Sequence, residues 1–118
     1  MATVLIIDDD PGLRRSLRWA LESLDHTVLE ARNGILAQPL WRAHAIDLVI
    51  TDMVMPGGEG AEAISALRRE AGHIPIIAIS GADPHFLALA LEAGADVTLA
   101  KPMTPLQLVN TVSGLLPH

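Results

Sequence analysis

Short apolar runs alternate along this chain with longer stretches in which apolar residues recur at helical spacing. The runs contain four to six residues and are rich in Ile, Leu and Val, and a helical stretch follows each of them. This alternation predicts five β–α units around a parallel sheet, the arrangement of an α/β fold. A run without polar interruption, such as residues 4–7, predicts a strand that is buried on both faces. The five expected strands cover residues 4–7, 27–30, 46–51, 74–79 and 97–100.

Capping residues followed by proline mark three of the expected helix starts. Asp10–Pro11, Asp83–Pro84 and Thr104–Pro105 each place an N-cap side chain before a proline at the first helical position. Gly94 is expected to end the fourth helix in a left-handed conformation. The five expected helices begin near residues 11, 33, 60, 84 and 105, and the last four end near residues 45, 71, 93 and 116.

The second expected helix, residues 33–45, contains an interior proline. Its apolar pattern places Leu36, Leu40 and His44 on one stripe. Pro39 lacks an N–H group and costs about 3 kcal/mol inside a helix. We therefore expect this helix to begin late, near Pro39, or to kink there.

Composition and charge limit the possible functions. The 118 residues have the size of one domain, so residues 1–118 are expected to fold as a single unit. Fourteen acidic and eight basic residues give a net charge of -6, and neither terminus carries a Lys/Arg run. Direct nucleic-acid binding is therefore not expected. Trp19 and Trp41, two of the few aromatic residues, lie on expected helices, where we expect them to pack.

The chain has no cysteine, which excludes disulfides and thiolate metal sites and agrees with a reducing cytoplasm. Its N-terminus lacks the basic flank and the length of a signal peptide. No apolar run approaches the roughly 20 residues of a membrane span. We therefore expect a soluble, cytoplasmic domain without contact to the membrane.

Polar residues follow four of the five expected strands. Asp8 and Asp9 follow the first strand, Asp52 the third, Ser80 the fourth and Lys101 the fifth. In an open α/β sheet the carboxyl ends of the strands form one rim, and ligands bind there at the topological switch point. These side chains are therefore expected to meet in one shallow cleft.

This combination of residues favours phosphoryl chemistry with a magnesium ion. Neighbouring carboxylates raise one another's pKa unless a cation is present. A ligand set made only of oxygen atoms favours Mg²⁺, which also takes phosphate oxygens as ligands. Such an ion beside the Lys101 ammonium would suit a phosphoryl group in transfer. Asp52 could then act as a nucleophile and form an acyl phosphate.

Four motifs in order make the chain similar to the receiver domain of two-component response regulators. The motifs are Ile6-Ile7-Asp8-Asp9-Asp10-Pro11, Ile50-Thr51-Asp52-Met53-Val54-Met55-Pro56-Gly57, Ile79-Ser80-Gly81-Ala82 and Ala100-Lys101-Pro102. The resemblance extends from Ala2 to Leu116. It implies a flavodoxin-like, doubly wound α/β fold with a five-stranded parallel sheet in the order 2-1-3-4-5 and five helices.

The resemblance also implies a metal site and a phosphoacceptor. Asp52 would accept the phosphoryl group, which would come from a phosphohistidine on a sensor histidine kinase or a phosphotransfer protein. Asp8, Asp9 and Asp52 would hold Mg²⁺ together with the backbone carbonyl of Val54. The domain would catalyse only its own phosphorylation and dephosphorylation, so it would not be an enzyme for another substrate.

The remaining motif residues imply phosphoryl contacts and a switch. Ser80 would bond one phosphoryl oxygen and Lys101 another, and the Lys101–Pro102 bond is a candidate for the cis form. The switch of receivers combines the Ser80 position with an aromatic residue at position 98, but this chain has Thr98 there. Met103 likewise stands where receivers usually have Phe. The usual aromatic switch is therefore absent, and the transmission of the signal must differ from the usual one.

The fourth expected helix, residues 84–93, is apolar nearly all round, whereas a helix packed on one side normally has a polar face. Some of its bulky side chains should be exposed, from the set Phe86, Leu87, Leu89 and Leu91. Exposed apolar patches often mark partner surfaces. The face formed by residues 84–93, 97–100 and 105–116 is therefore our candidate for a homodimer or effector contact.

Two other functions fit parts of the pattern. A receiver-like module could bind a partner constitutively, without taking a phosphoryl group. A haloacid-dehalogenase-like phosphatase would use Asp8 as its nucleophile, because Asp8 and Asp10 have the required Asp-x-Asp spacing. Such phosphatases need a cap or a longer chain for substrate selection, and 118 residues leave little room for one.

Overall fold

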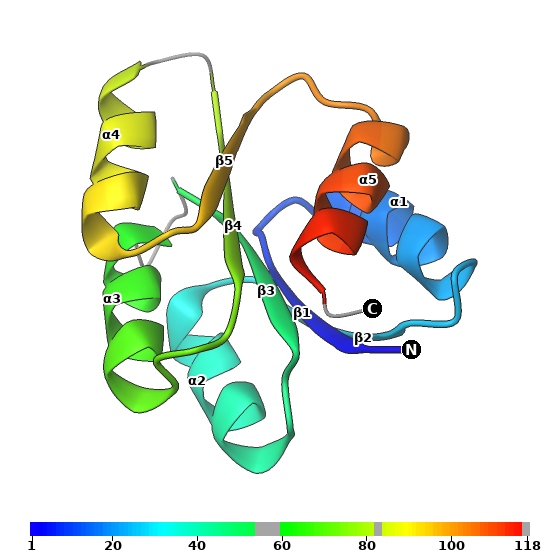
Figure 1. The fold of residues 1–118 in the computed structure, drawn as a ribbon, viewed down its shortest axis with the longest axis horizontal. Helices are drawn as coiled ribbons and strands as arrows, with labels where there is room; N and C mark the ends of the chain where they lie inside the picture. The colour runs from blue at the N-terminus through cyan, green and yellow to red at the C-terminus, as the bar shows by residue number, and fades with distance from the viewer. Residues whose placement is uncertain (54–59, 82–83, 117–118) are drawn as a thin grey trace.

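The computed structural model describes residues 1–53, 60–81 and 84–116. Five strands and five helices alternate along this described part of the chain (Figure 1). In chain order they are β1 Thr3–Ile7, α1 Pro11–Glu22, β2 Thr27–Ala31, α2 Gly34–Ala43, β3 Leu48–Asp52, α3 Gly60–Glu70, β4 Ile76–Ser80, α4 Pro84–Ala93, β5 Val97–Ala100 and α5 Pro105–Leu115. All neighbouring strands are parallel, in the order β2-β1-β3-β4-β5. The predicted fold class and strand order are confirmed.

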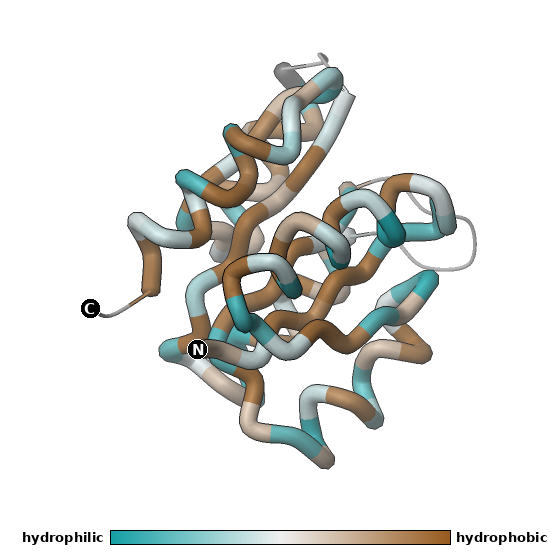
Figure 2. The backbone as a smooth tube through the Cα atoms, turned by 90° about the vertical axis from the view of Figure 1, so that its right-hand side faces the viewer, coloured by the Kyte–Doolittle hydropathy of each residue, from teal (hydrophilic) through white to brown (hydrophobic). Residues whose placement is uncertain are grey.

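Helices cover both faces of the sheet. Figure 1 shows α1 and α5 on one face and α2, α3 and α4 on the other. Along β1, Val4 and Ile6 pack in the layer that contains α1 and α5, whereas Leu5 and Ile7 pack in the opposite layer. Successive side chains of a strand point to opposite faces, so both sets are buried. This explains why the strands read as continuous apolar runs, and Figure 2 shows these hydrophobic segments passing through the molecule.

The predicted caps form as expected where the structure describes them. The Asp10 carboxylate accepts hydrogen bonds from the backbone N–H groups of Gly12 and Leu13 at the start of α1. Thr104 forms a capping box with Gln107 at the start of α5. Gly94 ends α4 with a φ of 120°. Asp83, the predicted cap of α4, lies outside the described residues.

We expected α2 to begin late, near Pro39, or to kink there, and the late start is wrong. The helix begins at Gly34, because the Asn33 side chain accepts a hydrogen bond from Leu36 N at 2.9 Å and caps the first turn. Pro39 removes the bond to the Ile35 carbonyl, but both residues are exposed, so the missing bond lies on the side that faces water.

The predicted buried stripe of α2 is also wrong. Ala37 and Trp41 are buried, whereas Leu36 and His44 are exposed. The two polar residues of this helix, Gln38 and Arg42, lie on one side, so the sequence pattern leaves several apolar faces that could be buried. Ala37 and Trp41 are the buried residues of this helix that pack in the core.

The two tryptophans differ in environment. Trp41 packs in the core, and its indole Nε1–H donates to Glu70 at 3.1 Å. Trp19 is 75% exposed, which contradicts the expectation that it packs inside. The buried side of α1 is formed by Leu17, Ala20 and Leu21, and Trp19 lies outside that stripe. None of the helices in the described part of the chain has the length and apolar character required to cross a membrane.

The turn after α1 yields a stability prediction. Asp25 has a φ of 65°, its N–H bonds Glu22 O, and the His26 N–H bonds Leu21 O. Asp and Asn adopt this left-handed conformation more readily than other non-glycine residues, but the negative charge of Asp25 is unfavourable at a helix C-terminus. We expect Asp25→Asn to raise the free energy of unfolding by about 0.5–1 kcal/mol in urea denaturation. Asp25→Ala should lower it by about 1 kcal/mol, and equal effects of the two substitutions would contradict this explanation.

Candidate functional site

Strand register brings two acidic residues to one edge of the sheet. Ile7 of β1 pairs with Thr51 of β3, so the next residues, Asp8 and Asp52, lie side by side where these strands end. The chain leaves β1 toward α1 on one face and leaves β3 toward α3 on the other. The edge between β1 and β3 is therefore the topological switch point, where α/β proteins bind ligands.

Three carboxylates meet at this edge, as predicted. Asp8, Asp9 and Asp52 each offer one carboxylate oxygen, and these atoms lie within 4.8 Å of one another. Asp8 is 1% exposed and Asp52 is 6% exposed, whereas Asp9 is open to solvent. Negative charges held this close at buried positions repel one another unless a cation offsets them.

Asp8 has one carboxylate oxygen in use and one without a partner. Its Oδ1 atom accepts a hydrogen bond from the backbone N–H of Asp10 at 2.9 Å. Its Oδ2 atom is buried and has no hydrogen-bond partner among the described residues. Burial raises the pKa of Asp8 to about 6, against the hydrogen bond from Asp10, and the negative charge of Asp52 also raises it. A buried oxygen without a donor beside two further carboxylates fits a hard divalent cation such as Mg²⁺.

Asp52 is contacted by a backbone donor and an ammonium group. Its Oδ1 atom accepts a hydrogen bond from Met53 N at 2.8 Å, and its Oδ2 atom lies 3.2 Å from Lys101 Nζ. Lys101 N donates to Ser80 O at 2.6 Å, which holds the start of the following loop against β4. The Lys101–Pro102 bond is cis, as the sequence suggested. The predicted lysine thus reaches the predicted acceptor.

Ser80 lies at the end of β4, next to the strand that carries Asp52. It is 1% exposed, and its Oγ atom has no hydrogen-bond partner within the described ranges. Because Asp52 pairs with Ile79, the hydroxyl follows directly along the same rim. A buried hydroxyl without a partner is available to an incoming anion.

The predicted roles of two further residues, Thr98 and Val54, are not tested by the structure. Thr98 pairs with Ala78 across β4 and β5 and is partly buried. Its predicted part in a switch is not tested by its position. Val54, whose backbone carbonyl was the fourth expected metal ligand, lies outside the described residues.

Gly60 is a contact residue that the sequence did not single out. A Cβ atom on Gly60 would lie 2.0 Å from the backbone O of Asp52 and 2.7 Å from Met53 Cα. The Gly60 N–H also donates to Met53 O at 3.1 Å. The first turn of α3 therefore rests on the backbone of Asp52, and only glycine leaves enough space. In the sequence Gly60 is one of three neighbouring glycines, with Gly57 and Gly58, a cluster that suggests freedom of the loop rather than this contact.

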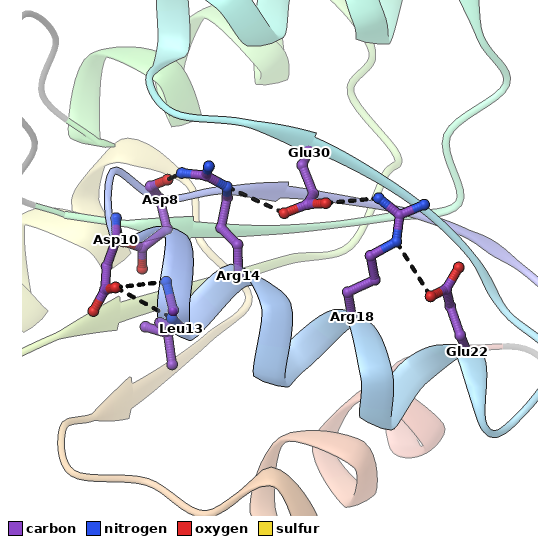
Figure 3. Close-up of polar contacts among 8 residues, drawn as sticks. Asp8, Asp10, Leu13, Arg14, Arg18, Glu22 and Glu30 are labelled. Atoms are coloured by element: carbon purple, nitrogen blue, oxygen red, sulfur yellow. Dashed lines mark hydrogen bonds and ion pairs between the residues drawn. The ribbon is translucent and has the colours of Figure 1, made fainter.

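Arg14 is a second residue that sequence reasoning missed. Its Nη1 donates to the backbone O of Asp8 at 2.6 Å, and its Nε donates to Glu30 at 3.1 Å (Figure 3). The two bonds join α1, β1 and β2. Arg14 follows the cap residue Asp10 by one turn, but no sequence pattern shows that its side chain returns to Asp8.

The pKa of Asp8 predicts a pH dependence of stability in metal-free buffer. Because the pKa is raised from 3.8 to about 6, the folded state binds the proton more tightly, and the free energy of unfolding should fall as pH rises through 6. Asp8→Asn should remove this loss, with a gain of up to about 3 kcal/mol above pH 7 and no gain below about pH 4. Urea denaturation in the presence of a chelator gives the free energy of unfolding of the wild type and of Asp8→Asn at each pH. If the plots of unfolding free energy against pH stay parallel for the wild type and Asp8→Asn, Asp8 is not the group responsible.

Comparison with known proteins identifies the family to which this chain belongs. The family model described as the response regulator receiver domain matches residues 4–113. The chemotaxis protein CheY of Halobacterium salinarum is 33% identical over 114 residues, which cover 96% of this chain and 95% of that protein. The response regulator GtcR of Aneurinibacillus migulanus is 34% identical over 97% of this chain. The match covers 47% of GtcR, so this chain spans about half the length of that relative.

A solved structure shows the same fold at similar length. CheY4 of Vibrio cholerae superposes with a TM-score of 0.91 at 28% sequence identity, covering 98% of this chain and 99% of that one. The matched family model, the strand order and the carboxylates at the switch point all agree. The chain belongs to the response regulator receiver domain family of two-component signal transduction.

Proposed function

We propose that residues 1–118 form one receiver domain that accepts a phosphoryl group on Asp52 in a Mg²⁺-dependent reaction and then changes its partner binding. The observation that carries this proposal is the arrangement around Asp52. Its carboxylate lies within 4.8 Å of Asp8 and Asp9 and bonds Lys101 Nζ at 3.2 Å. Carboxylates and an ammonium group around one buried acceptor suit a reaction in which negative charge is transferred and spread over phosphoryl oxygens.

Each residue of the site has a defined task in this proposal. A carboxylate oxygen of Asp52 forms a bond to phosphorus, and the bond from phosphorus to the donor nitrogen breaks, with the electron pair left on the nitrogen. Lys101 pairs with Asp52 before transfer and with a phosphoryl oxygen afterwards. The Ser80 hydroxyl, which is buried and has no partner among the described residues, donates to another phosphoryl oxygen.

The metal would be held by Asp8, Asp9 and Asp52, with the carbonyl of Val54 as the expected fourth protein ligand. When bound, Mg²⁺ would offset the charge that builds on the phosphoryl oxygens. The Oδ2 atom of Asp8, which is buried and has no partner among the described residues, would be satisfied by such a cation. The donor in our proposal is a phosphohistidine on a sensor histidine kinase or a phosphotransfer protein, encountered in the cytoplasm.

The proposed output surface is formed by α4, β5 and α5. Leu91 of α4 is 55% exposed and Leu106 of α5 is 68% exposed, whereas Phe86, Leu87 and Leu89 are partly buried. We propose that movement of Ser80 toward the phosphoryl group alters the packing of Thr98 and thereby this surface. A homodimer or an effector would bind there.

The phosphatase alternative receives no support from the site. Its Asp-x-Asp pair would need Asp10 as a free acid, but the Asp10 carboxylate accepts hydrogen bonds from the backbone N–H groups of Gly12 and Leu13. Asp10 thus acts as the N-cap of α1. In our proposal the domain acts on no substrate other than its own acyl phosphate.

A mass measurement tests the proposed acceptor. The purified chain is incubated with Mg²⁺ and a small-molecule acyl phosphate, and intact mass is recorded. We expect one added phosphoryl group in the wild type, none after removal of Mg²⁺, and none in Asp52→Asn. Asp10→Asn is the matched control, because it changes an acid of the same rim that caps α1, and it should keep the adduct.

Other outcomes would favour the alternatives. An adduct that persists in Asp52→Asn and disappears in Asp8→Asn would support the phosphatase chemistry. No adduct on the wild type, together with no binding of a beryllium fluoride mimic, would support a module that binds its partner constitutively.

The contact of Gly60 with the acceptor backbone predicts a further variant. Gly60→Ala should displace Asp52, because the new methyl group would overlap its backbone oxygen. We expect the rate of phosphorylation to fall about 10- to 100-fold. Gly34→Ala is the control, because its Cβ would lie 2.9 Å from Ala63 Cβ, away from the rim. Both variants should lose about 1–3 kcal/mol of stability, and equal phosphorylation rates in the two would refute the role of Gly60.

A further inference from the structure

Asp8 is held at almost every polar atom it possesses. Its N–H donates to Ala31 O at 3.0 Å, and its backbone O accepts from Arg14 Nη1 at 2.6 Å. Its Oδ1 accepts from Asp10 N at 2.9 Å. Only Oδ2 is left without a partner among the described residues. The surrounding bonds therefore fix the direction in which this single oxygen points.

The guanidinium of Arg14 is itself held firmly. Its Nε bonds one oxygen of Glu30 at 3.1 Å, and the other oxygen of Glu30 bonds Arg18 Nη1 at 2.6 Å (Figure 3). The Arg14 side chain is 19% exposed, compared with 42% for Arg18. Because the guanidinium is a rigid planar fork, the bond to Glu30 also aims Nη1 at Asp8.

We infer that Arg14 is a positioning residue for the metal ligand Asp8, and that Glu30 holds it in place. This inference rests on the proposed function, in which Asp8 holds Mg²⁺. The hydrogen bond of Arg14 to Asp8 and the positive charge of Arg14 have opposite effects on the affinity for Mg²⁺. A positive charge beside the site repels Mg²⁺, so its removal alone would tighten binding. Loss of the bond from Arg14 would remove one of the three hydrogen bonds that hold Asp8, so the ligand would be less well oriented and Mg²⁺ binding would weaken. Glu30 offsets the charge, so the geometric effect prevails.

A titration with Mg²⁺ alone separates the two effects. Isothermal calorimetry on the whole chain compares the wild type with Arg14→Met and Arg18→Met. Both substitutions remove one positive charge that bonds Glu30 from the same helix, but only Arg14 contacts Asp8. We expect Arg14→Met to lose about 10-fold in Mg²⁺ affinity, as is usual for groups that orient a metal ligand. Arg18→Met should stay within about twofold of the wild type.

The outcomes distinguish positioning from general stabilisation. Thermal unfolding without metal measures the structural effect of each substitution. The unfolding temperature should change in both variants. Equal Mg²⁺ affinities in the two variants, or tighter binding by Arg14→Met, would overturn the inference. If Arg14→Met does not fold, Arg14→Lys keeps the charge without the fork, and it should bind Mg²⁺ about threefold more weakly than the wild type. Wild-type affinity in that variant would also overturn the inference.

Failure of the proposed function gives a different result. A wild-type chain that binds no Mg²⁺ and takes no phosphoryl group would refute the metal site itself. A wild type that does both, with Arg14→Met indistinguishable from Arg18→Met, would refute only the role of Arg14.

Discussion

The repulsion between buried carboxylates at the ends of β1 and β3 is the constraint on which the rest of the site depends. Asp8 and Asp52 lie at the same edge, and both are almost fully buried. The negative charge of each buried carboxylate must be compensated, and the two carboxylates have different sets of donors. Asp52 accepts from a backbone N–H and from the ammonium of Lys101, whereas Asp8 has, within the described part of the chain, a backbone N–H donor to one carboxylate oxygen only. Burial raises the pKa of Asp8, the negative charge of Asp52 adds to the rise, and a cation at this position would offset both.

The fold can hold this costly arrangement because the sheet beneath it is apolar on both faces. The strands of the sheet bury side chains alternately against the α1/α5 layer and the α2/α3/α4 layer. A shift of one residue in register would exchange the two layers, so the register is strongly fixed. The same register determines which polar residues follow each strand. Core packing, rather than any contact among the polar residues, therefore brings Asp8, Asp52 and Ser80 to one rim.

Features that depend on the order and ends of the strands could be predicted from the sequence, whereas features that depend on how the layers pack could not. Strand-end residues could be predicted because a parallel sheet brings carboxyl ends together whatever the details of packing. The buried side of α2 could not be predicted, because apolar residues lie on several of its sides and only the packed core shows that Ala37 and Trp41 are the buried ones. Arg14 and Gly60 were missed for another reason. Their roles depend on distances to backbone oxygens of Asp8 and Asp52, and such distances exist only after the layers have packed.

The contrast between the two tryptophans has a consequence for spectroscopy. Trp19 is open to water on α1, and Trp41 is enclosed by α2, α3 and the sheet, with its indole bonded to Glu70. The molecule thus carries one tryptophan in a polar, solvent-exposed environment and one in a buried environment, on opposite faces of the sheet. Neither residue belongs to the rim of acidic side chains. An emission change on ligand binding would therefore report a displacement of a helix layer, and its wavelength would tell which layer had moved.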